Sequence, residues 1–221
     1  WKYNGIPKNE RTSLMKQTWD LVGHFYSNKD SISDLIQSIP DKKDFNKTTS
    51  LKFKKDLWDF FLNNKTINSK EMKILITNHG YTTRILSPLF KKVSTFDKFD
   101  ENLHIAKMIN YDFSNIDYYK VDIYAEQWPS VEFDVVFIDC MHTYDGVKND
   151  IINVLNFTNE KEVYFVFDDY GLNWGPNSGQ VKQAVDEFVN NNTIEIVKEI
   201  GYPKGTLIAE DSFLGATEGL I

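Results

Sequence analysis

The sequence predicts an α/β protein with a Rossmann-like, doubly wound sheet of seven strands, mostly parallel, with an antiparallel last strand. Two observations favour this fold. From residue 50 onwards, short apolar runs alternate with segments whose apolar residues recur every three to four positions. Such alternation is typical of a parallel sheet with helices on both faces. The chain has 221 residues, of which 41% are hydrophobic, enough for one domain with a sizeable core.

The first 47 residues differ from the rest of the chain. They are polar and carry two short helical patterns, over residues 12–25 and 33–39, and Pro40 then ends the second pattern. We therefore interpret residues 1–47 as an N-terminal helical extension and residues 48–221 as the sheet domain. The extension is too short to build its own core, so we expect it to dock on the sheet domain or on a neighbouring subunit.

The strands and helices of the sheet domain follow in order. Ser50 is predicted to cap a helix whose apolar face contains Phe53, Leu57, Phe60 and Phe61. The predicted strands are Lys73–Thr77, Lys92–Phe96, Tyr118–Val121, Phe133–Asp139, Val163–Phe167, Glu195–Glu199 and Thr206–Ala209. The helices between them contain Ile85 and Leu86, Leu103 and Ala106, Val147 to Leu155, and Val181 to Phe188. Because only a short link joins the last two strands, we expect them to pair as an antiparallel hairpin.

Charge and cysteine content exclude several classes of protein. With 25 basic and 32 acidic residues the net charge is −7, whereas a nucleic-acid-binding protein usually presents a basic face. The single cysteine, Cys140, allows no internal disulfide, so we expect a reducing compartment such as the cytoplasm. No apolar run approaches the roughly 18 residues of a membrane helix, so no membrane association is expected.

Acidic residues follow four of the predicted strands. Asp97 and Asp122 come after the second and third strands, Asp139 ends the fourth, and Asp168 and Asp169 follow the fifth. Parallel strands bring their carboxyl ends to one edge of a sheet, which is where ligands bind in such folds. The sequence therefore predicts an acidic ligand site at this edge.

At this point the chain resembles the class I S-adenosylmethionine-dependent methyltransferases over roughly residues 50–210. It is most similar to metal-dependent O-methyltransferases of the catechol type and of the macrolide-sugar and cephalosporin-tailoring type. Three segments carry the resemblance: Val93–Asp97 with Glu101, Asn102 and Leu103; Phe133–Asp139 with His142, Tyr144, Gly146 and Asp150; and Val166–Gly171 with Val181, Ala184, Val185 and Phe188.

The resemblance implies how the cofactor S-adenosylmethionine would be held. Asp97 would accept hydrogen bonds from the ribose hydroxyls, and Asp122 would lie near the adenine amino group. Each has a plainer interpretation, because Asp97 could be a solvated loop residue and Asp122 could cap the following turn.

The resemblance also implies a divalent cation, with Mg²⁺ expected, on Asp139, Asp168 and Asp169. Three carboxylates at one point repel one another unless a cation lies among them. The alternative is that one caps a helix and another is solvated. His142 stands where catechol-type relatives have a catalytic lysine, so we expect it to act as the base, with Asp139 beside it in the catalytic site. It could instead be a structural histidine.

The first cofactor motif departs from the family. The relatives usually have an acidic residue in the first strand and a Gly-x-Gly-like turn, whereas here Ile74 and Ile76 occupy the places of the acid and the first glycine. Of the glycines only Gly80 remains. Beside Gly80, either Asn78 and Thr82 or the nearby residues 48–50 would supply replacement hydrogen bonds to the methionine end of the cofactor, and Asp139 is also expected to contact the cofactor. The alternative is that this site has degenerated.

The leading functional hypothesis is a metal-assisted O-methyltransferase for a small hydroxylated acceptor, preferably a sugar or glycoside. The N-terminal helices would border the acceptor pocket or form contacts in a homodimer; a packing role away from the cleft is the alternative. A second hypothesis is a methyltransferase-like binding or scaffold domain that has lost its cofactor. An NAD-dependent dehydrogenase is disfavoured, because no Gly-x-Gly-x-x-Gly follows the first strand.

Overall fold

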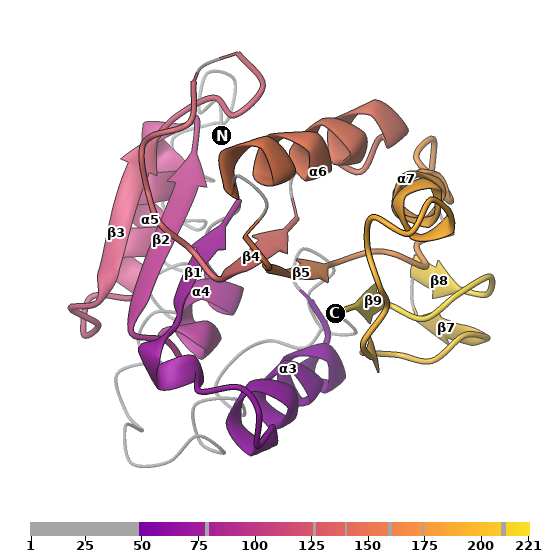
Figure 1. Ribbon diagram of the computed structural model, residues 1–221, viewed down its shortest axis with the longest axis horizontal. Helices are drawn as coiled ribbons and strands as arrows, with labels where there is room; N and C mark the ends of the chain where they lie inside the picture. The colour runs from indigo at the N-terminus through magenta and orange to yellow at the C-terminus, as the bar shows by residue number, and fades with distance from the viewer. Residues whose placement is uncertain are drawn as a thin grey trace, which may run out of the picture.

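The computed structural model describes residues 49–77, 80–125, 127–139, 141–158, 161–173, 175–208 and 211–221 (Figure 1). The predicted N-terminal extension, residues 1–47, lies outside these residues. The helices and strands are α3 (Leu51–Asn63), η1 (Ser69–Glu71), β1 (Lys73–Ile76), α4 (Tyr81–Leu86), β2 (Lys92–Asp97), α5 (Asp100–Ile109), β3 (Ile116–Lys120), β4 (Val135–Ile138), α6 (Tyr144–Thr158), β5 (Tyr164–Phe167), α7 (Gln180–Asn190), β6 (Glu199–Ile200), β7 (Thr206–Ile208), β8 (Asp211–Phe213) and β9 (Gly219–Leu220). Among the described segments, none of the helices has the length and apolar character needed to cross a membrane.

The main sheet has seven strands in the order β3-β2-β1-β4-β5-β9-β6. Strands β1 to β5 pair in parallel, and β9 pairs antiparallel with both β5 and β6. The chain first places β2 and β3 on one side of β1 and then returns to place β4 and β5 on the other side. The order in which strands are added therefore changes direction between β1 and β4. The predicted fold class, a mostly parallel doubly wound sheet with an antiparallel last strand, is confirmed.

The predicted hairpin at the end of the chain is wrong. Strand β6 pairs with β9, and β7 pairs with β8 in a separate two-stranded sheet. The expectation failed because the true partner of β6, Gly219–Leu220, is only two residues long and has no periodicity to recognise. A short link between two strands therefore did not determine their pairing.

Side chains of the central strands are buried on both faces of the sheet. Ile74 and Ile76 point to the face covered by α3 and α4, whereas Leu75 points to the face covered by α6 and α7. Figure 1 shows α3 and α6 on opposite sides of the sheet. Continuous apolar strands are the expected pattern for a parallel sheet covered on both sides, so the acidic residues can lie only where these strands end.

The beginning of α3 holds the last strand in place. Ser50 caps the helix by accepting a hydrogen bond from the Phe53 amide at 3.0 Å, as predicted. Its amide and hydroxyl both donate to the fully buried carboxylate of Glu218, at 3.0 and 2.5 Å. Glu218 also accepts from the Tyr202 amide at 2.8 Å. Because Glu218 directly precedes β9, these contacts join the start of the domain to the strand that completes the sheet.

A buried ion pair anchors α4, the helix that follows the turn after β1. The Arg84 guanidinium is 1% exposed and donates two hydrogen bonds to the Asp112 carboxylate, at 2.7 and 3.2 Å, and one to the Ile109 carbonyl at 2.7 Å. It also lies over the Phe113 ring, 5.2 Å from its centre. These contacts tie α4 to the end of α5.

We predict that Asp112→Ala lowers the free energy of unfolding by about 3 kcal/mol, because it leaves the buried guanidinium without its counter-charge. Urea denaturation measures this. The matched control is Glu71→Ala, which removes the exposed ion pair of Lys91 and Glu71 and should cost less than about 1 kcal/mol. Equal losses in the two variants would contradict the anchoring role of Arg84.

Candidate active site

The carboxyl ends of the parallel strands form one acidic edge of the sheet. Asp97 is the last residue of β2, Asp139 follows β4, and Asp168 and Asp169 follow β5. The pairings β2–β1, β1–β4 and β4–β5 are all parallel, so these residues emerge on the same side. The clustering that the sequence predicted at this edge is therefore present in the fold.

At the ends of β4 and β5, an imidazole lies between two carboxylates. His142 Nε2 is 3.2 Å from Asp139 Oδ1, and His142 Nδ1 is 3.5 Å from Asp169 Oδ2. One potential ligand atom from each of the three residues lies within 4.8 Å of the other two. Sequence analysis grouped Asp139, Asp168 and Asp169 as metal ligands; in the structure, the three residues with converging ligand atoms are Asp139, His142 and Asp169.

The carboxylates raise the pKa of His142 to about 9. Burial alone would lower this pKa, but the hydrogen bond to Asp139 and the charges of Asp169, Asp139 and Asp168 outweigh it. In the absence of a bound cation, the imidazole is therefore protonated at neutral pH. It supplies the positive charge that neighbouring carboxylates require, a function that sequence analysis gave to a metal ion.

Asp168 and Asp169 differ in how they interact with His142. Asp169 has φ of 53°, a left-handed conformation that aspartate tolerates better than most side chains, and its carboxylate faces His142. Asp168 is 5% exposed and acts on His142 through its charge. Gly171 follows shortly after and packs against the backbone of residues 216 and 217, where an added Cβ would lie 2.3 Å from the Thr217 carbonyl oxygen.

The two residues expected to bind the nucleoside organise their own loops. Asp97 accepts hydrogen bonds from the Phe99 amide at 2.8 Å and from the Asn102 side chain at 3.0 Å. Asp122 accepts from the Tyr124 amide at 3.1 Å and lies 3.8 Å from the Lys98 ammonium group. The turn-capping interpretation of Asp122 therefore describes one contact that it makes, and a ligand contact would come in addition to it.

The turn after β1 retains one feature of a cofactor site. Gly80 has φ of 105°, and among the described residues other than its chain neighbours no atom lies within 4 Å of the position that a Cβ would occupy there, so these residues leave the space beside it open. Thr82 follows in α4 and is 9% exposed. Ile74 and Ile76 are 1% exposed in the core and present no polar group. Asn78 lies outside the described residues.

Sequence analysis assigned no function to two polar residues near this edge. Tyr124, in the loop after β3, donates a hydrogen bond to the buried Asp150 of α6 at 3.1 Å. The Tyr124 hydroxyl also accepts one from the Met141 amide at 3.3 Å. Asp150 belongs to the segment that carries the family resemblance, and an acidic residue on the apolar face of a helix is the signal that could have identified it.

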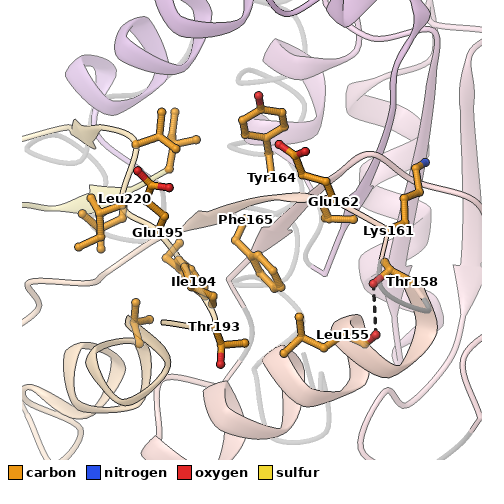
Figure 2. Close-up of a pocket in the computed structure, with 16 residues that line it drawn as sticks. Leu155, Thr158, Lys161, Glu162, Tyr164, Phe165, Thr193, Ile194, Glu195 and Leu220 are labelled. Atoms are coloured by element: carbon orange, nitrogen blue, oxygen red, sulfur yellow. Dashed lines mark hydrogen bonds between the residues drawn. The ribbon is translucent and has the colours of Figure 1, made fainter. Parts of the chain in front are cut away.

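A cavity of about 620 Å³ lies at the opposite end of β5 (Figure 2). Leu155 of α6, Phe165 of β5 and Ile194 direct apolar side chains toward its centre, while the carboxylate of Glu195 lies near its edge. Tyr164 and Phe165, which line it, begin the strand that Asp168 and Asp169 follow. None of Asp139, His142 and Asp169 contributes to its wall. The cavity is therefore separate from the acidic edge.

Comparison with known proteins shows what the central part of the chain is similar to. Residues 77–170, from the end of β1 to the turn after β5, match a family described as a methyltransferase domain. The match includes Asp97, Asp139, His142, Asp168 and Asp169. No curated protein sequence matches the chain.

Solved structures of methyltransferases have a similar fold at low sequence identity. The N-methyltransferase NodS from Bradyrhizobium japonicum WM9, in complex with S-adenosyl-L-homocysteine, is 14% identical with a TM-score of 0.53, over 88% of this chain and 94% of that chain. The tRNA (m1A58) methyltransferase TrmI from Aquifex aeolicus is 20% identical with a TM-score of 0.50, over 87% and 74% of the chains. A SAM-dependent methyltransferase from Leishmania major is 10% identical with a TM-score of 0.50, over 82% and 74%.

We predict that the protein loses part of its stability when His142 deprotonates. The pKa of His142 is raised from 6.5 to about 9, so its contribution is fully present below pH 6.5 and disappears as the pH rises through about 9. In urea denaturation with a chelator present, His142→Ala should cost about 2 kcal/mol at pH 6 and much less at pH 10. The control is His104→Ala at an exposed position of α5. A pH-independent difference between parent and His142→Ala would contradict this assignment.

Proposed function

We propose that this protein transfers a methyl group from S-adenosylmethionine to a hydroxyl oxygen of a small acceptor, with a sugar or glycoside as the preferred class. The observation that carries the proposal is the convergence of Asp139, His142 and Asp169 at the carboxyl edge of a methyltransferase domain. A net charge of −7 supports a small molecule over a nucleic acid as the acceptor.

The residues at the edge of the sheet suit the cofactor. When bound, S-adenosylmethionine supplies a methyl group on a positively charged sulfur. The open space beside Gly80 would receive its methionine part, and the carboxylate of Asp97 at the end of β2 would accept hydrogen bonds from its ribose. Asp122 and the Tyr124 segment would border the adenine. This arrangement would place the reactive methyl group between β1 and the acidic residues that follow β4.

The donor set also suits a divalent cation. Asp139 and Asp169 offer carboxylate oxygens and His142 offers a ring nitrogen, with Asp168 adding negative charge nearby. An imidazole ligand favours a cation such as Mn²⁺ or Zn²⁺ over Mg²⁺, which prefers oxygen, so the set accommodates a wider range of metals than sequence analysis expected. A cation bound there would orient and acidify the acceptor hydroxyl.

The function of His142 depends on its proton. With both ring nitrogens protonated and facing Asp139 and Asp169, it cannot accept another proton. When no cation occupies its ring nitrogen and it has lost one proton, one nitrogen keeps its hydrogen bond to a carboxylate while the other accepts the proton of the acceptor hydroxyl. Asp139 thereby orients the base, and the raised pKa of about 9 predicts that this reaction is faster in alkaline solution. With a cation on its ring nitrogen, His142 would be a ligand and not the base.

A catalytically inactive scaffold is the second candidate. The observation that favours it is the burial of Ile74 and Ile76, because β1 then presents no carboxylate to the methionine end of a cofactor. Thermal denaturation with S-adenosylhomocysteine separates the two candidates, since a ligand at 100 times its Kd adds about 2.7 kcal/mol of stability. A scaffold would gain no stability and would transfer no methyl group.

We predict that Asp97→Ala weakens binding of S-adenosylhomocysteine by about 10- to 100-fold, the cost of hydrogen bonds to a charged acceptor. Isothermal titration calorimetry measures this. The control is Asp100→Ala, three residues after Asp97, which removes an exposed carboxylate that forms an ion pair with Lys120. Equal affinity of the parent and Asp97→Ala would overturn the assignment of Asp97 to the ribose.

We predict that the parent protein binds Mn²⁺, measured by electron paramagnetic resonance, and that Asp169→Asn weakens this binding at least about tenfold. Because the cation competes with the proton on His142, affinity should rise as the pH increases from 7 to 9. Glu195→Gln, at the opposite end of the sheet, is the control. Affinity that is the same in the parent and in Asp169→Asn would eliminate this metal site.

A further inference from the structure

Asp150 is a carboxyl group inside the apolar side of α6. It is 0% exposed, and Val147, Ile151 and Val154 on the same helix are buried around it. Its Oδ2 accepts a hydrogen bond from the Tyr124 hydroxyl at 3.1 Å, while its Oδ1 is buried without a hydrogen-bond partner among the described residues. Burying a carboxyl group with one oxygen unpaired costs folding free energy, so its position calls for an explanation.

The Tyr124 hydroxyl connects Asp150 to the candidate active site. It donates to Asp150 and accepts from the Met141 amide at 3.3 Å, which together use its one proton and one of its lone pairs. Met141 lies between Asp139 and His142 in the chain. The backbone amide of Tyr124 is itself bound to Asp122 at 3.1 Å. One side chain thus spans the loop that carries Asp122 and the turn that carries His142.

We propose that Asp150 is a positioning residue that acts through Tyr124 to hold the Asp139–His142 turn against the loop after β3. This inference rests on the proposed function in one respect, namely that the turn carries the base. Asp150 itself does not touch the acceptor or the cofactor, because it is fully buried. Its effect passes through the phenol to the Met141 amide, and so to the backbone that places His142 between Asp139 and Asp169.

The chemistry of Asp150 determines which substitutions test the proposal. Burial raises its pKa to about 7, although the Tyr124 hydrogen bond partly opposes this. Both the neutral and the ionised carboxyl group can accept a hydrogen bond from the Tyr124 hydroxyl. Asparagine keeps an acceptor oxygen at the same place, so Asp150→Asn should preserve the connection. Asp150→Leu removes the acceptor, and Tyr124→Phe removes the connecting hydroxyl.

The first experiment measures hydrogen exchange of the Met141 amide by NMR. In Tyr124→Phe and Asp150→Leu, exchange should be about fivefold faster than in the parent, since the Met141 hydrogen bond is lost or misdirected. In Asp150→Asn it should match the parent. The control is Tyr119→Phe, which removes a tyrosine hydroxyl that contacts Asp117 on β3, away from this turn. Unchanged Met141 exchange in a folded Tyr124→Phe protein would overturn the proposal, and this variant decides the question even if Asp150→Leu does not fold.

The second experiment measures methyl transfer in the same variants. We expect Tyr124→Phe to lower kcat about fivefold with little change in the KM for S-adenosylmethionine, and Asp150→Asn to retain the parent kcat. If kcat is unchanged in Tyr124→Phe while Met141 exchange is faster, the connection does not position the base and the proposal is wrong. If the parent transfers no methyl group but the exchange results are as expected, the proposed function fails while the structural connection stands.

Discussion

The imidazolium of His142 between Asp139 and Asp169 is the interaction on which the candidate site depends. The parallel strands β4 and β5 deliver carboxylates to the same point, and carboxylates this close repel one another without a positive charge among them. His142 supplies that charge from within the chain. The cation proposed for this site would compete with the imidazole proton for the same ring nitrogen.

The rigid part of the molecule keeps this cluster in place. Between their ends, β1, β4 and β5 carry only apolar side chains, and the parallel pairing of β4 with β5 brings Asp139 and Asp169 to the same side. Glu218 holds β9 beside β5 through its contacts with Ser50, and Arg84 holds α4 against the end of α5. These buried charges lie outside the site, yet they determine where the turns after β1 and β5 can lie.

Two groups of proposed site residues are connected through Tyr124. Asp97, Asp122 and the space beside Gly80 are proposed for the cofactor, and Asp139, His142 and Asp169 are proposed for the acceptor. The hydrogen bonds of Tyr124 to Asp150 and Met141 join them across the sheet edge. Methyl transfer requires the two substrates to be held at reacting distance, so a fixed relation between these loops is a physical requirement of the chemistry.

The sequence by itself determined the features that rest on local pattern. Alternating strand and helix periodicities predicted the doubly wound sheet, the Ser50 cap predicted where α3 begins, and aspartates after successive strands predicted the acidic edge. The roles of Asp97 and Asp122 in cofactor binding and of the metal remain predictions. These features could be predicted because each depends on residues within a few positions of one another, or on the shared direction of parallel strands.

Only the tertiary structure decided which groups meet. The pairing of β6 with the two-residue strand β9 has no local signature, and the sequence placed β6 with Thr206–Ala209 instead. His142 was assigned as a base, but its position between Asp139 and Asp169, and therefore its raised pKa, depends on how β5 lies beside β4. Tyr124 meets Asp150 across 26 residues and Met141 across 17. Such contacts follow from packing of the whole chain, which periodicity does not encode, because burial and electrostatics act between neighbours in space.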